Sequence, residues 1–204
     1  MKKLSFLASL VVFCLPLAAS AQEVAPKAEI FGGYSFLRVD LGAVPAGTVP
    51  AGTVPSNIDT HGFNVSFAAN PARHVGIISE FSQFTKSDSA SNLLGDPSLT
   101  GINAKVRVLT LLFGPRVTLH RGKVEPFVHA LFGAARADAS ALGMSLGDPG
   151  YAFAYALGGG FDVKVHNNLA IRLGQVDYLG ARAGGEGLDN FRYSVGVVIR
   201  LGNR

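Results

Sequence analysis

The sequence predicts an all-β protein, a closed antiparallel up-and-down β-barrel of about eight strands. Two observations predict this fold. Segments of alternating apolar and polar residues recur along the chain, and the connections between these segments are long and short in turn. The composition, with 25 glycines, 14 phenylalanines and 16% charged residues, also suits a chain of strands and turns.

Residues 1–21 have the features of a cleaved export signal. Their positive start, apolar middle and small-residue cleavage site are Lys2-Lys3, Leu4 to Leu17 and Ala19-Ser20-Ala21, respectively. An uncleaved membrane anchor is the alternative, but a spanning helix needs roughly 18 to 20 apolar residues, and Pro16 interrupts this run. Cleavage after Ala21 removes the only cysteine and leaves residues 22–204, which we expect to form one domain.

Charge and motifs argue against several classes of function. The formal net charge of +4 falls to +2 when Lys2 and Lys3 leave, because 16 basic residues then face 14 acidic ones. These charges are scattered along the chain, so they do not predict a nucleic-acid partner. The sequence contains no nucleophile elbow, phosphate loop or metal-binding spacing of Cys and His, so we predict no enzyme activity, cofactor or metal.

Eight segments follow the alternation of a strand. In chain order they are Ala28 to Val39, Thr60 to Ala69, His74 to Lys86, Ile102 to His120, Val124 to Ala137, Tyr151 to Val165, Asn168 to Leu179 and Asn190 to Gly202. The sixth is the clearest, because Tyr151, Phe153 and Tyr155 alternate with alanines. In the fourth, the apolar residues change face near Gly114-Pro115, where we expect a β-bulge.

The connections indicate which rim of the barrel is elaborated. The long ones cover residues 40–59, 87–101, 138–150 and 180–189, and the short ones cover residues 70–73, 121–123 and 166–167. One plain rim and one rim of longer loops is the arrangement of outer-membrane barrels, whose tight turns face the periplasm. The first long loop repeats Pro-Ala-Gly-Thr-Val over Pro45 to Val54, either as a recognition tip or as a slipped duplication.

Side-chain size indicates that the apolar face points outward. In the sixth and eighth strands, the face opposite the aromatic residues holds small and charged residues, which suit a polar lumen better than a soluble core. With a periplasmic N-terminus, all five tyrosines fall in the external halves of their strands. The predicted external aromatic belt consists of Tyr34, Tyr151, Tyr155, Tyr178 and Tyr193.

The predicted inward faces gather charged residues into a luminal network. Its members are Glu29, Glu80, Lys105, Arg107, Glu125, Asp162, Lys164, Arg172, Arg192 and Arg200. An eight-stranded lumen is just wide enough for side chains, so paired charges would plug it, whereas the excess of basic residues leaves an anion-preferring pore as the alternative. Matching depth predicts three ion pairs, namely Glu29–Arg200 where the last strand closes on the first, Asp162–Arg172 across a tight turn and Glu80–Arg107 across a long loop.

Histidines add one further alternative. His129 would face the lumen with Glu125, and Ser194 also faces inward, so a serine–histidine enzyme is a minor alternative without a defined geometry. The remaining histidines fall at strand ends or turns, where we expect them to be solvated. They are His61, His74, His120 and His166.

The closing strand reads Phe191-Arg192-Tyr193-Ser194-Val195-Gly196-Val197-Val198-Ile199-Arg200-Leu201-Gly202. With the export signal and tight turns, it makes the chain resemble the small outer-membrane β-barrel proteins of the OmpA transmembrane-domain and OmpX type. The resemblance implies an outer-membrane location, contacts with lipid, lipopolysaccharide and the barrel-insertion machinery, and a monomer. The chain departs from it by ending Leu201-Gly202-Asn203-Arg204 where such proteins carry a terminal aromatic residue.

These features together predict a non-enzymatic envelope protein. Its barrel would be a scaffold, and four external loops would give it a structural or surface-interaction role. A small anion-preferring porin is the second hypothesis, and a soluble periplasmic ligand-binding barrel is the third.

Overall fold

The structure is a computed structural model that describes residues 25–40, 57–89, 91, 101, 103–120, 122–141, 144–145, 150–183 and 186–203. The predicted export signal and the duplicated segment of the first long loop lie outside these residues. Within the described ranges, no helix is both long enough and apolar enough to cross a membrane.

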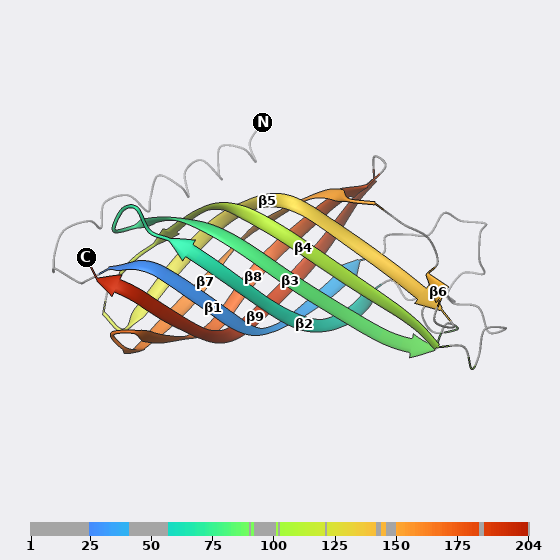
Figure 1. The fold of residues 1–204 in the computed structure, drawn as a ribbon, viewed down its shortest axis with the longest axis horizontal. Coiled ribbons are helices and arrows are strands. Elements are labelled where there is room, and N and C mark those ends of the chain that lie inside the picture. The colour runs from blue at the N-terminus through green and yellow to red at the C-terminus, as the bar shows by residue number, and fades with distance from the viewer. Residues whose placement is uncertain are drawn as a thin grey trace, which may run out of the picture.

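The described strands close into one barrel (Figure 1). They are β1 (Pro26–Asp40), β2 (Asn57–Ala69), β3 (Val75–Ser89), β4 (Asn103–Thr118), β5 (Val124–Ala141), β6 (Met144–Ser145), β7 (Ala152–His166), β8 (Leu169–Ala183) and β9 (Glu186–Asn203). Each long strand pairs antiparallel with its sequence neighbour, β6 extends only the end of β5, and β9 returns to pair with β1. The prediction of an eight-stranded, closed up-and-down barrel is confirmed.

The last hairpin differs from the sequence prediction. β8 continues to Ala183 and β9 begins at Glu186, with Ala183 and Glu186 as cross-strand partners. The predicted long connection over residues 180–189 is therefore wrong, because most of it is strand. The two intervening residues are Gly184 and Gly185, a pair typical of a tight hairpin.

The bulge predicted at Gly114-Pro115 is also wrong. β4 pairs with β3 through both residues without a shift in register, and the register with β5 is the same on either side of them. The even-numbered residues of β4 point inward along its whole length. The apolar residues change face because the lumen becomes apolar toward one end of the barrel.

A bulge occurs instead in β8. Asp162 pairs with Arg172 and Phe161 pairs with Gly174, which leaves Leu173 as an extra residue. The extra residue reverses the alternation along β8. As a result Arg172 is buried in the lumen, whereas Tyr178, an even number of residues later, lies on the outer face.

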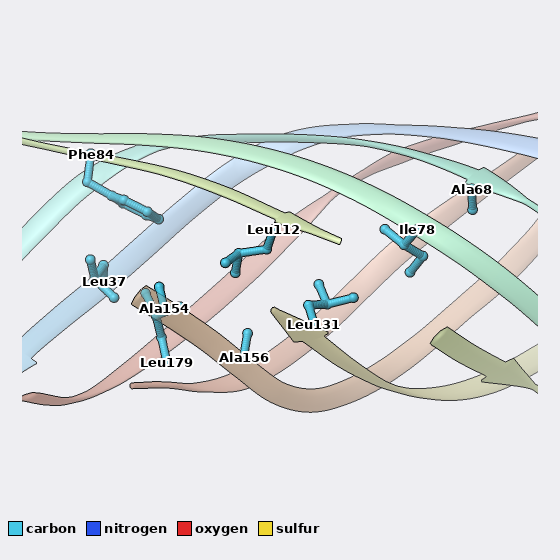
Figure 2. Packing of buried hydrophobic residues seen from close by; sticks show 9 residues of the cluster. All are labelled: Leu37, Ala68, Ile78, Phe84, Leu112, Leu131, Ala154, Ala156 and Leu179. Carbon is cyan, nitrogen blue, oxygen red and sulfur yellow. The ribbon is translucent and has the colours of Figure 1, made fainter. Parts of the chain in front are cut away.

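Most large apolar side chains on the outer face are exposed. Phe67, Leu111, Phe113, Val128 and Phe191 are each about 50 to 60% accessible, and β3 alternates exposed with buried positions along most of its length. The apolar core lies inside the barrel, where Leu37, Phe84, Leu112 and Leu131 point toward the axis from different strands (Figure 2).

Candidate functional site: the barrel lumen

The lumen contains two groups of buried charged side chains. The turn-side cluster lies near the tight turns and consists of Glu29, Asn70, Arg116, His120, Glu125 and Arg200. The central cluster lies further along the axis and consists of Asn64, Glu80, Ser82, His129, Asp162, Arg172, Gln175, Asp177 and Arg192. Successive side chains of a strand point to opposite faces of the sheet, so one face of each strand contributes its side chains to the lumen.

In the turn-side cluster, each carboxylate is shared between basic groups. Arg116 donates to Glu29, and Nε of Arg200 lies 3.4 Å from Oε1 of Glu29. Arg200 also donates to Glu125, which lies 3.4 Å from Nδ1 of His120. The predicted pair Glu29–Arg200 therefore exists, and each of its members has a second partner.

In the central cluster, Asp177 accepts more hydrogen bonds than any other described residue. Its Oδ2 accepts from Nε and Nη2 of Arg192 at 2.8 and 2.6 Å and from Gln175 at 2.8 Å, and its Oδ1 lies 2.7 Å from Nε2 of His129. Nη1 of Arg192 lies 2.6 Å from Oε1 of Glu80. Arg192 thus neutralises two carboxylates. The predicted ion pair Glu80–Arg107 is wrong, because Glu80 pairs with Arg192.

Arg172 is held by both charge and aromatic rings. It donates to both carboxylate oxygens of Asp162 at 2.8 and 3.0 Å, so the predicted pair Asp162–Arg172 forms in the bidentate geometry that suits a guanidinium. Its guanidinium carbon also lies 4.4 Å from the ring centre of Phe31 and 4.3 Å from that of Phe127. Rings on opposite walls therefore sandwich this cation.

Several contacts bridge strands that are not neighbours in the sheet. Glu80 of β3 meets Arg192 of β9, Glu29 of β1 meets Arg116 of β4, and Glu125 of β5 meets Arg200 of β9. At least one strand separates the partners in every case. These side chains therefore meet across the interior and occupy it.

Three residues predicted to belong to the luminal network are not buried in the lumen. Lys105 and Arg107 are exposed on the outer face of β4, because the strand keeps even-numbered residues inward along its whole length. Lys164 shares the face of Asp162 but is only half-buried near the β7 to β8 turn. The placement of Lys105 and Arg107 in the lumen is therefore wrong.

The lumen also holds residues that the sequence did not point to. Arg116 was left out of the predicted network although the change of face expected at Gly114-Pro115 leaves it inward, and Asp177 and Gln175 were missed because the bulge at Leu173 reverses their parity. His120, expected to be solvated, is buried beside Glu125. The shift of apolar residues from Ile171 and Leu173 to Val176 and Tyr178 is a signal that could have found Asp177.

The five tyrosines all lie on the outer face. Tyr34, Tyr151 and Tyr193 are exposed, whereas Tyr155 and Tyr178 are half-buried against each other with ring centres 6.1 Å apart. The Tyr155 ring covers Gly180, where a Cβ would lie only 2.3 Å from it. The hydroxyl of Tyr193 donates to the carbonyl oxygen of Leu173 at 3.0 Å, so this ring covers the bulge.

Charged side chains cap the outer face at the loop-bearing rim. Besides Lys105 and Arg107, this rim carries the ion pairs Arg38–Asp59 and Arg136–Asp138, each at 2.9 Å and each accessible to solvent. The apolar outer surface therefore has a charged upper border.

The geometry of the described residues brings no catalytic set together. His129 contacts Asp177, whereas Ser194 shares a hydrogen bond with Ser35, so the serine–histidine alternative has its two members on different partners. Among the residues that the structure describes, no group of three or more His, Cys, Asp or Glu side chains has an arrangement that could hold a metal.

Comparison with known proteins finds likeness in structure alone. No family model and no curated protein sequence matches the chain. Among solved structures, Neisserial surface protein A matches with a TM-score of 0.60 at 9% identity, over 88% of this chain and 100% of that one. Ail of Yersinia pestis matches with 0.55 at 17%, over 86% and 99%, and OprG of Pseudomonas aeruginosa with 0.51 at 14%, over 88% and 97%.

Each of these three matches covers 86–88% of this chain and 97–100% of the other chain. Because the sequence identities are low, the matches show a likeness of fold. It agrees with the closed meander and the apolar outer face described above. The chain therefore has the fold of the small eight-stranded β-barrels of the outer membrane, as its resemblance to the OmpA and OmpX type implied.

Proposed function

We propose that this chain is a non-enzymatic outer-membrane protein whose lumen is plugged by ion pairs and whose external loops have a structural or surface-interaction role. Export would remove residues 1–21, and residues 22–204 would form the single barrel domain. The plugged lumen is supported by one observation: acidic and basic side chains from non-neighbouring strands meet across the lumen, as Glu80 and Arg192 do.

The outer face supports a location in lipid. Large apolar residues such as Leu111, Phe113 and Val128 are about 60% accessible, and similar residues surround the barrel. In water such a surface would be a large apolar patch without a partner, whereas in a membrane the lipid tails cover it and keep it from water. This argues for a membrane barrel over a soluble periplasmic one.

The charged rim supports lipopolysaccharide as a contact. Lys105 and Arg107 are exposed above the apolar surface, at the depth where phosphate groups of this lipid would lie next to the barrel. The other proposed contacts are the barrel-insertion machinery and a ligand of the loops, with the chain as a monomer. The solved structure of Ail contains the heparin analogue sucrose octasulfate, so a sulfated polyanion belongs among the loop ligands to be tested.

A small anion-preferring porin is the second candidate, and the structure weakens its basis. Among the described residues, the buried acids are Glu29, Glu80, Glu125, Asp162 and Asp177, and the buried arginines are Arg116, Arg172, Arg192 and Arg200. The excess of basic residues on which the anion preference rested is therefore missing from the buried set.

Cell fractionation followed by gel electrophoresis tests the membrane assignment. We expect the protein in outer membranes, and we expect an unboiled sample to migrate faster than a boiled one because the barrel stays folded in detergent. Recovery in the soluble periplasmic fraction would overturn the proposal.

A further inference from the structure

The external half of the lumen contains an apolar cavity of about 160 Å³. Its walls come mainly from β1, β4, β5, β7, β8 and β9. The lining residues are Leu37, Val39, Val108, Thr110, Ala135, Arg136, Ala137, Gly150, Ala152, Ala154, Leu179, Ala181 and Asn190. Five alanines leave the space that larger side chains would otherwise fill.

The cavity offers water almost no hydrogen-bonding partner. The hydroxyl of Thr110 is within 3.0 Å of the hydroxyl of Ser82, and Nδ2 of Asn190 donates to the carbonyl oxygen of Leu179 at 3.1 Å. Arg136 is engaged with Asp138. A water molecule needs two to four polar partners, and apolar cavities of roughly 150 Å³ stay dry and take up molecules the size of benzene.

The inner end of the cavity is closed. Leu37, Ala154 and Leu179, which line it, pack against Phe84, and Leu112 and Leu131 follow along the axis (Figure 2). Phe84, Leu112 and Leu131 are completely buried. The central cluster lies at the depth of these residues and further toward the tight turns. A molecule in the cavity therefore cannot pass into the turn-side half of the lumen.

The outer end of the cavity is accessible. Exposure rises along the lining from Ala154, which is completely buried, through the half-buried Ala152 and Ala181 to the exposed Ala137. These residues follow one another toward the loop-bearing ends of β5, β7 and β8. Access is thus from the external side of the barrel.

We propose that this cavity is a binding site for one small, uncharged hydrocarbon group of about six to eight carbon atoms. The lining removes the group from water without asking for a polar contact, and the closed inner end retains it. The group can belong to a free hydrocarbon or to the end of an acyl chain, and both sources share this chemistry. The site is a feature of the lumen that neither the ion-pair plug nor the loops require.

Methyl NMR of the barrel in nanodiscs of deuterated lipid, with toluene as the probe, tests the site. We expect saturable shifts of the methyl groups of Leu37, Val108 and Leu179. The outward methyl groups of Leu157 and Val197 should shift only linearly, as toluene partitions into lipid. Absence of a saturable shift would overturn the proposal, unless protonated lipid gives nuclear Overhauser contacts from its acyl chains to Leu37, which would identify the acyl chain as the occupant.

Two alanine variants give a matched comparison. Ala181→Leu fills the cavity and should weaken toluene binding by about tenfold or more, because the added side chain occupies the ligand's space. Ala130→Leu adds the same atoms to β5 at a position that does not line the cavity, and should bind toluene as the unmodified protein does. Equal affinities in the two variants, with both barrels folded, would contradict the site.

Discussion

At the scale of single residues, Asp177 is the most connected acid in the lumen. Its two oxygens serve Arg192, Gln175 and His129, which come from different strands. Gly158 lies directly opposite it, and a Cβ there would be 2.1 Å from Oδ1. A glycine at this position therefore leaves the space in which the carboxylate reaches His129.

Replacing Asp177 with Asn should destabilise the barrel strongly. The substitution keeps the shape but removes one of the two charges that neutralise the buried Arg192, and loss of one member of a buried pair costs about 3 to 5 kcal/mol. The measurement is the free energy of unfolding in urea with the folded barrel in detergent or lipid.

Asp59→Asn is the control for this measurement. Asp59 pairs with Arg38 on the outer rim, where its side chain is 45% accessible, so the loss should be only about 0 to 1 kcal/mol. Similar losses at Asp59 and Asp177 would show that burial adds nothing to the luminal pairs.

Residues could be assigned to the lumen from sequence only where alternation was unbroken. Glu29, Asp162 and Arg200 lie inward as strict alternation predicts. Asp177 was missed because one extra residue at the β8 bulge changes the parity. The apolar residues do move from odd to even positions there, from Ile171 and Leu173 to Val176 and Tyr178, but the sequence prediction placed no bulge in this strand. Lys105 was misplaced because apolar residues of β4 were assumed to mark the lipid side.

At the scale of strands, β7 separates two environments residue by residue. Leu157 is 47% accessible on the outer face, and its neighbour Ala156 is completely buried inside. Leu157→Arg should cost about 2 to 4 kcal/mol if the position lies near the middle of the bilayer, because an ion would then face lipid. Folding into lipid vesicles followed by urea titration measures this cost.

Ala156→Ser is the matched substitution on the inner face. The hydroxyl replaces one hydrogen in the lumen and should change stability much less than Leu157→Arg. Equal effects at the two positions would mean that the inward and outward faces of β7 have been assigned incorrectly.

The pairing of β1 with β9 joins the two ends of the barrel sequence. Glu29 and Arg200 are direct cross-strand partners and form an ion pair, but Arg116 and Glu125 supply each with another contact. A double-mutant cycle with Glu29→Gln and Arg200→Gln should therefore give a coupling of about 0.5 to 3 kcal/mol, below the loss in either single variant. Coupling indistinguishable from zero would show that the two strands close without help from this pair.

At the scale of the whole molecule, the lumen has two halves of different chemistry. Ion pairs fill it from the tight turns to its middle, and the external half is lined by Leu37, Val108, Ala154 and Leu179. Closure and strand number could be predicted from sequence, because period and loop length are local signals. The division of the lumen could not, because it depends on which inward residues of distant strands reach the same depth.

A lumen filled in this way should conduct little. The purified protein in planar bilayers should show no large, regular steps of conductance, because Arg192 joins Glu80 on β3 to Asp177 on β8 across the interior and leaves no continuous water path there. Replacing Glu80, Asp177 and Arg192 together with Ala removes the arginine along with both of its carboxylate partners, so steady conductance should rise if these side chains block the path. An Asp59→Asn barrel, altered only on the outer rim, should conduct as little as the unmodified protein. Regular large steps from the unmodified protein would instead favour the porin, since ions would then pass through a lumen whose charged side chains are free to move aside.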